Sequence, residues 1–170
     1  KAETGSDKSL GELETELQIM IDTWKTETYP VAWAYLESCG ALGNDPGWIM
    51  NPFGRVRHFP KATSNRMRGE NQRASQNFNI QSTVADACML AMKLMLDYRI
   101  QHKLGFRLIN QIHDAIMLEV PVDEIEVTKK MFHETMGNIE IPITDTRTFK
   151  LGVDVEVLSR WGEKFEKDTK

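Results

Sequence analysis

Hydrophobic and polar residues alternate over 106–121 (FRLINQIHDAIMLEVP), and this pattern predicts a β-hairpin. Apolar side chains recur at even-numbered positions on both sides of the middle: Phe106, Leu108, Ile112, Ile116, Leu118 and Val120. A period of two is typical of strands with one buried face. Polarity concentrates at His113 and Asp114, so we place the turn there, although the Asn-Gly or Gly-Gly pair common in tight turns is absent.

A helical period predicts two helices within residues 10–36. Ser9 and Glu12 form a capping-box pair, and apolar residues at helical spacing follow as far as Thr28. We expect this first helix to cover Leu10–Thr28 and its apolar stripe to lie in the core. Tyr29-Pro30 breaks it, and Pro30 opens a short second helix through Leu36.

A longer helix is predicted from residues 81–83 (QST) to about Gln101, with a broad apolar face that indicates burial. Arg73, Asn77 and Gln81 are spaced by four. If the helix extends back to Arg73, all three line one edge and could touch a single groove. Otherwise they are polar residues around a helix start. Amide side chains at such an edge can donate to the minor-groove acceptors that every base pair shows.

Three further elements complete the expected α+β fold. Residues 47–59 indicate a small hairpin, and Asp123 with Glu126 suggests a capping box that opens an amphipathic helix ending at Gly137. Residues 148–157 alternate cleanly and predict a strand whose solvent face carries Asp154 and Glu156.

Composition is that of an ordinary globular protein. Of the 170 residues, 41% are hydrophobic and 27% charged, enough for one substantial core. We expect a flexible segment at 1–8, helices over 9–105, and a hairpin, helix and strand over 106–170. Two isolated cysteines suggest no zinc site or disulfide framework. No apolar run reaches the length of about 18 residues that a membrane span needs, so we expect a cytoplasmic protein without membrane contact.

A local basic run departs from the net charge of −4. Between residues 55 and 73 the chain carries six basic side chains against the single acid Glu70: Arg55, Arg57, Lys61, Arg66, Arg68 and Arg73. Such a run is the footprint of phosphate binding or simply a solvated loop face, and charge alone leaves both open.

The carboxylate of Asp114 also has two interpretations. At the tip of a stiff hairpin it is well placed to ligate a hard cation such as Mg²⁺, which prefers oxygen ligands. The other interpretation, which spacing alone favours, is an ordinary turn aspartate, because Asp is common in turns for local hydrogen-bonding reasons.

Several stretches together resemble the family A, Pol I-type DNA polymerases. Residues 73–86 (RASQNFNIQSTVAD) resemble that family's RxxxNxPxQGTxAD segment, and residues 111–114 (QIHD) resemble its motif C, QVHDE. Residues 29–35 (YPVAWAY) are similar to YPxVxxYM, and residues 54–60 (GRVRHFP) to GRRRxLP. The stretch 152–164 resembles the last palm strand and tail. The resemblance covers about residues 10–165.

The resemblance implies a partial polymerase palm, with an antiparallel sheet around the 106–121 hairpin backed by long helices, plus the back of the fingers. The implied function is template-dependent transfer of nucleotides from dNTPs to a primer 3'-hydroxyl by two Mg²⁺ ions. Asp114 would be one of two metal-binding palm carboxylates, and His113 would lie by the primer-terminal backbone. Contacts to the DNA primer-template would come from Arg73, Asn77, Gln81 and Gln111. Arg55 and Arg57 would serve phosphate or loop-packing roles.

The chain also departs from the family pattern. Ala115 replaces the motif C glutamate, Ser82 a glycine and Asn79 a proline, which suggests a divergent, phage-like branch acting in a host cytoplasm. No DYSxIELR-type motif A with the second metal aspartate is present, nor the RxxxKxxxFxxxYG fingers helix. We therefore expect the chain alone to be inactive and to need the missing N-terminal polymerase part, in the same chain or as a split subunit.

Two other functions stay open. A non-catalytic DNA-binding or assembly module derived from a polymerase palm would fit Ala115 and the missing motif A. An unrelated Mg²⁺-dependent nuclease would need a carboxylate cluster built from Asp114, Asp154 and Glu156.

Overall fold

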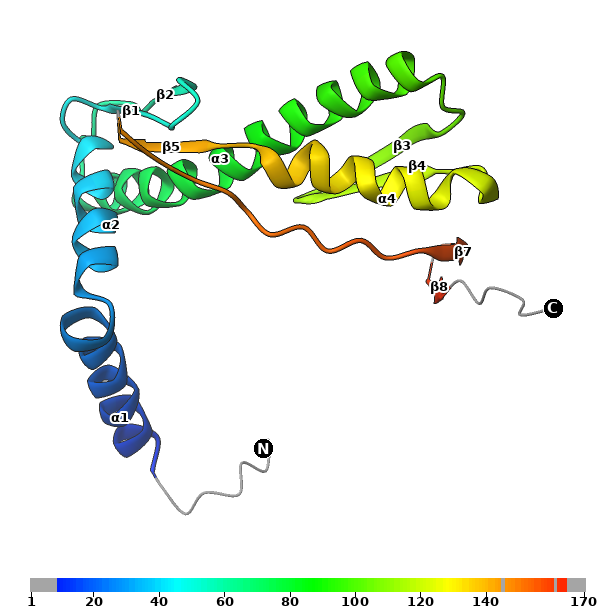
Figure 1. The fold of residues 1–170 in the computed structure, drawn as a ribbon. Helices are drawn as coiled ribbons and strands as arrows, with labels where there is room; N and C mark the ends of the chain where they lie inside the picture. The colour runs from blue at the N-terminus through cyan, green and yellow to red at the C-terminus, as the bar shows by residue number, and fades with distance from the viewer. Residues whose placement is uncertain (1–8, 145, 161, 165–170) are drawn as a thin grey trace. The chain divides into compact units, whose positions relative to one another are not determined.

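The computed structural model describes residues 9–144, 146–160 and 162–164. They form helices and small two-stranded antiparallel sheets, which confirms the mixed α+β class (Figure 1). The chain divides into two compact units. The first holds the described residues up to Ile49 together with Arg57–Asn77, and the second holds Met50–Val56 and the described residues from Phe78 onward. The expected flexible segment 1–8 lies outside the described residues.

The first helix, α1, spans Leu10–Thr23, and the π-helical turn η1 continues it over Trp24–Thr28. The predicted capping box at its start is confirmed, because Ser9 accepts from the Glu12 amide and the Glu12 carboxylate accepts from the Ser9 amide. The prediction that its apolar stripe lies in the core is wrong. None of the residues of α1, all of which the structure describes, is buried. An amphipathic pattern specifies which face is apolar, but it does not supply a partner for that face.

The second helix, α2 (Pro30–Leu42), begins at the predicted proline and is longer than expected. Glycines at its C-terminal end lie close to the N-terminal part of α3 (Asn65–His102). A Cβ atom added to Gly43 would lie 2.5 Å from the Ser75 hydroxyl oxygen, and one added to Gly40 would lie 2.6 Å from Gln72 Cγ.

Helix α3 starts well before the predicted position at residue 81. Ser64 caps it, since its hydroxyl accepts from the Met67 amide at 3.2 Å. Arg73, Asn77 and Gln81 are therefore all helical, as the extended alternative required. Arg73 and Asn77 belong to the first unit and Gln81 to the second.

Strands β1 (Trp48–Met50) and β2 (Val56–His58) form the predicted small hairpin. Strands β3 (Arg107–Ile112) and β4 (Ala115–Glu119) form the predicted larger one, with Ile112 paired to Ala115 across a two-residue turn. The core of the second unit lies under this larger hairpin. Its most buried side chains come from α3, the start of the hairpin, the following helix and the next strand: Ala91, Met95, Phe106, Met131 and Ile141.

The helix after the hairpin, α4, spans Ile125–Glu134, with 3-10 turns before it (η2, Val122–Glu124) and after it (η3, Met136–Asn138). The predicted capping box of Asp123 and Glu126 is wrong, because Glu124 is the N-cap residue and no side chain caps the helix. The Glu124 carboxylate instead accepts the Gly105 amide, with its two oxygens at 2.9 and 2.8 Å from that nitrogen.

The prediction of a strand over 148–157 is also wrong. Strand β6 (Arg147–Phe149) pairs with β5 (Ile141–Thr144), and β7 (Leu158–Arg160) pairs with β8 (Glu163–Lys164). Residues 150–157 between them belong to no strand and have no partner strand among the described residues. Their side chains still alternate, with Val153 and Val155 half-buried and Asp154 and Glu156 exposed. The sequence pattern predicts this alternation of burial correctly. A β-strand also needs a neighbouring strand to pair with, and the pattern does not show whether one is present.

Candidate functional site

The turn between β3 and β4 consists of His113 and Asp114, as predicted. His113 has φ +54°, in the left-handed region that side-chain-bearing residues seldom adopt and in which His and Asp are enriched. This conformation explains how a tight turn forms there without glycine. The Gln111 side-chain amide donates to the His113 carbonyl at 3.1 Å and so holds one peptide group of the turn.

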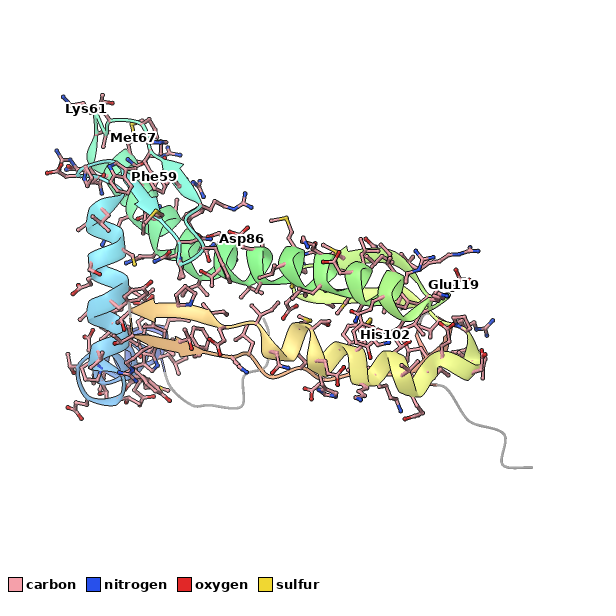
Figure 2. The ribbon with its side chains drawn as sticks, turned by 45° about the horizontal axis from the view of Figure 1, so that its top comes forward. Phe59, Lys61, Met67, Asp86, His102 and Glu119 are labelled. Carbon is pink, nitrogen blue, oxygen red and sulfur yellow. The ribbon has the colours of Figure 1, made fainter. Side chains whose placement is uncertain are left out.

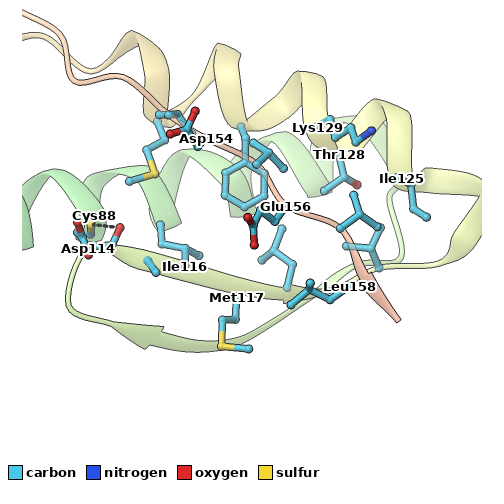
Figure 3. Close-up of a pocket in the computed structure, with 18 of the residues that line it drawn as sticks. Cys88, Asp114, Ile116, Met117, Ile125, Thr128, Lys129, Asp154, Glu156 and Leu158 are labelled. Carbon is cyan, nitrogen blue, oxygen red and sulfur yellow. Dashed lines mark hydrogen bonds between the residues drawn. The ribbon is translucent and has the colours of Figure 1, made fainter. Parts of the chain in front are cut away.

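Asp114 presents its carboxylate to solvent at this tip. Its backbone carbonyl accepts a hydrogen bond from the buried Cys88 thiol of α3, with 3.5 Å between sulfur and oxygen (Figure 3). Burial, and secondarily the charge of Asp114, raises the pKa of the Cys88 thiol above its usual value, so the thiol keeps the proton that it donates. The site is therefore an exposed carboxylate whose backbone carbonyl is hydrogen-bonded to the buried Cys88 thiol.

The Asp114 carboxylate could supply one ligand of a Mg²⁺ site whose other ligands come from elsewhere. Mg²⁺ is commonly held by one or two carboxylates plus substrate phosphates, not by a complete cage of protein oxygens. Among the described residues, no three His, Cys, Asp or Glu side chains lie close enough to hold a metal ion. Asp114, Asp154 and Glu156 all line one groove, but this part of the chain does not bring them into the cluster that a nuclease would need (Figure 3).

The groove has a volume of about 1060 Å³ and lies within the second unit. α3, β4, α4 and the segment 151–160 line it. The Thr128 hydroxyl is buried beside it and has no hydrogen-bond partner within the described structure. Apolar side chains such as Ile116 and Phe132 dominate the lining, so packing more than charge characterises this groove.

Arg55 is engaged by a network that the sequence did not reveal. Its guanidinium forms a bidentate ion pair with Asp86, which projects from α3 beside the β1–β2 loop (Figure 2). Asn51, only 2% exposed, donates to Asp86 at 2.7 Å and to Ser82 at 3.0 Å. The hydrogen bond from Arg55, with further help from Asn51, lowers the pKa of Asp86 below its usual value. These contacts give Arg55 a loop-packing geometry.

The remaining candidate residues come from β2, α3 and the β3–β4 hairpin. The Arg57 guanidinium carbon lies 5.1 Å from the centre of the Phe59 ring. Arg73, Asn77 and Gln81 are exposed on α3. Within the second unit, the structure brings Gln111, His113 and Asp114 together at the hairpin tip.

Sequence reasoning missed Asn51, Asp86 and Cys88. Asp86 does end the stretch 73–86 on which the family resemblance depends, and that position was the available signal for it. Asn51 and Cys88 carried no such signal, because their roles depend on segments distant in sequence.

No helix in the described part of the chain is long and apolar enough to cross a membrane.

Comparison with known proteins bears on this geometry. The family model "DNA polymerase family A" matches residues 4–167. DNA polymerase I A, chloroplastic/mitochondrial, of Arabidopsis thaliana is 30% identical over 150 residues, which cover 86% of this chain and 14% of that protein. DNA polymerase I of Deinococcus radiodurans is 32% identical over 114 residues, covering 66% of this chain and 12% of that protein.

A solved structure also matches. It is the POL domain of Pol1 from M. smegmatis in complex with DNA primer-template and dNTP, with a TM-score of 0.68 and 25% sequence identity over 73% of this chain and 22% of that one. The chain thus spans a small part of each relative. Because the family model covers nearly all of the sequence and the fold agrees with a polymerase domain, this chain belongs to DNA polymerase family A.

Proposed function

We propose that this chain supplies part of the palm and the back of the fingers of a DNA-directed DNA polymerase. The observation that carries the proposal is the exposed carboxylate of Asp114 at the tip of a hairpin, in a chain of this family. A rigid hairpin with a packed core beneath it is suited to hold a ligand in one place.

Asp114 is the residue that would hold Mg²⁺, with the remaining ligands coming from substrate and from polypeptide outside this chain. When bound, a pair of such ions activates the primer 3'-hydroxyl and stabilises the charge that develops on the triphosphate. His113 adjoins this carboxylate and would orient the primer-terminal backbone. Its left-handed backbone conformation sets its direction relative to Asp114.

The DNA primer-template would lie along exposed polar side chains. Gln81 and Gln111 in the second unit, and Arg73 and Asn77 in the first, carry donors suited to phosphates and minor-groove acceptors. Readout of acceptors that all base pairs share gives binding without sequence preference. The M. smegmatis relative was solved with primer-template and dNTP, which supports these two partners.

A second polymerase part, in the same chain or in a split subunit, completes the proposal. The chain spans 14% of the length of the Arabidopsis relative, and its hairpin turn, His113 and Asp114, carries a single carboxylate. The 170-residue chain alone would then be unable to assemble a two-metal site.

Replacing Asp114 tests the catalytic assignment. In the complete protein, Asp114→Asn keeps the side-chain shape but removes the anionic metal ligand. We expect nucleotide incorporation to fall by about a thousandfold or more, since a metal supplies several kcal/mol of transition-state stabilisation. Primer-template affinity, measured by fluorescence anisotropy, should stay within about twofold of that of the original protein, because the substitution removes no contact to a phosphate or a base.

Asp97→Asn is the matched control. Asp97 is an exposed carboxylate on α3 that pairs with Lys93, so its loss should leave incorporation unchanged. Near-normal turnover of Asp114→Asn would remove Asp114 from the catalytic role.

A non-catalytic DNA-binding module is the second candidate, and Ala115 at the hairpin tip favours it. Primer extension separates the two functions. DNA binding by the complete protein without extension at any Mg²⁺ concentration would identify the module.

A further inference from the structure

Cys88 lies directly beneath the turn that carries Asp114. Its side chain is 1% exposed, and its thiol donates to the Asp114 carbonyl at 3.5 Å (Figure 3). A hydrogen bond to this carbonyl restrains the ψ angle of Asp114. That angle fixes how the rest of the residue projects from the turn, so the thiol acts on the direction of the carboxylate.

The turn needs such a restraint. His113 adopts φ +54°, which is unfavourable for a residue with a Cβ atom. Gln111 holds the His113 carbonyl at 3.1 Å, and Cys88 holds the next carbonyl along the chain. Two side chains, one from β3 and one from α3, therefore fix the two successive peptide groups of the tip.

The Asp114 carboxylate itself has no hydrogen bond or ion pair with any residue that the structure describes. Its orientation therefore depends on its own backbone. We propose that Cys88 is a positioning residue that orients Asp114 for metal binding through the Asp114 carbonyl. The catalytic meaning of this inference rests on the proposed function, whereas the restraint on the turn does not.

Three substitutions at Cys88 separate hydrogen bonding from packing. Cys88→Ser keeps a donor, Cys88→Ala removes it, and Cys88→Val removes it while filling the space. Amide hydrogen exchange of residues 113–116 in the complete protein reports directly on the turn. We expect exchange about threefold to tenfold faster in the Ala and Val variants, as for loss of one hydrogen bond, and near the original rate in the Ser variant.

Nucleotide incorporation should follow the same order. In the complete protein we expect kcat to fall about threefold to tenfold in the Ala and Val variants, with the KM for dNTP unchanged and kcat restored in the Ser variant. Cys39 of α2 is buried in the first unit, so Cys39→Ala and Cys39→Ser are the matched controls and should change neither measurement.

Equal effects of Ala, Val and Ser, or no effect of Ala and Val, would overturn the positioning role. Such results would assign Cys88 to packing alone. If the unmodified complete protein shows no incorporation, the proposed function fails instead, and hydrogen exchange still decides whether Cys88 restrains the turn. Thermal unfolding of each variant checks that it is folded.

Discussion

Asp86 shows how one carboxylate can join two elements. It accepts from the Arg55 guanidinium and from the Asn51 amide, and Asn51 in turn accepts from the Phe53 and Arg55 backbone amides at 3.0 and 2.9 Å. Every polar atom of the Asn51 side chain is thereby used, which a residue with 2% exposure requires. The β1–β2 loop thus depends on a few polar side chains for its attachment to α3.

The ion pair makes stability depend on pH. The Arg55 guanidinium lowers the pKa of Asp86 below the ordinary value of 3.8, so the folded state binds this proton more weakly than the unfolded state. Its contribution is therefore present above pH 3.8 and is lost as pH falls through the lower folded value. We expect urea unfolding to show Asp86→Asn less stable than the original protein at pH 7, with the difference shrinking below pH 3.8.

Asp97→Asn serves as the control here too, since its partner Lys93 is one helical turn away and both are exposed. It should show a smaller difference at pH 7. A difference for Asp86→Asn that is constant from pH 7 to pH 3 would refute the linkage.

The contacts of single residues were the hardest feature to predict from the sequence. Asp114 and His113 could be placed at a turn because polarity concentrates between two alternating runs. The hydrogen-bond partners of Asp86 and Cys88 could not be predicted, because each partner lies more than 25 positions away and no local pattern marks such pairs.

Helices α2 and α3 meet through glycine in the first unit. A Cβ atom on Gly43 would lie 2.5 Å from the Ser75 hydroxyl oxygen and 2.7 Å from the Asn71 carbonyl oxygen. Backbone at that distance cannot move aside cheaply. We expect Gly43→Ala to destabilise the protein by about 1–3 kcal/mol, the usual range for overpacking, as measured by thermal or urea unfolding.

Gly11 in α1 provides the opposite case, since nothing lies within 4 Å of its added Cβ. Gly11→Ala should stabilise by about 0.5–1 kcal/mol, because alanine loses less backbone entropy in a helix. Stabilisation by both substitutions would show that α2 and α3 are not in close contact at Gly43.

Elements were predicted well where the pattern was local. Both hairpins and the start of α1 follow from alternation, turn residues and a capping box. The start of α3 was missed because polar residues 65–80 show no apolar stripe, although the cap at Ser64 begins the helix there. The strand over 148–157 failed for the opposite reason, since alternation was clear but no strand pairs with 150–157 in the described structure.

Apolar side chains exposed on α1 bear on whether the whole chain associates. Helix α1 leaves large apolar side chains in contact with solvent: Leu10, Leu17, Ile19, Met20 and Ile21. Four of them, Leu10, Leu17, Met20 and Ile21, recur at helical spacing and so share one face of α1, and exposed apolar surface of this kind promotes association. We expect the 170-residue chain to show a mass that rises with concentration in light scattering.

Replacing Leu17, which is 56% exposed, and Met20, which is 67% exposed, by glutamate should reduce that association. Gln18→Glu adds one negative charge at a polar position of α1 and is the control for either replacement made singly. A constant monomer mass for the unmodified chain at all concentrations would contradict this expectation.

The family of the whole chain was readable from sequence, because motif spacing survives where overall identity is near 30%. The metal-binding role of Asp114 stays a prediction, since the described residues contain no group of three His, Cys, Asp or Glu side chains that could hold a metal ion.

The bond from Gly105 to Glu124 has a consequence for how the hairpin responds to stress. These two residues join the chain just before β3 to the chain just after β4, so the ribbon between them is closed at its base. We expect this ribbon to open less often from its base, because the contact between Gly105 and Glu124 must break first. Asp114 would then keep its place at the turn for longer, since the two strands that support it stay paired.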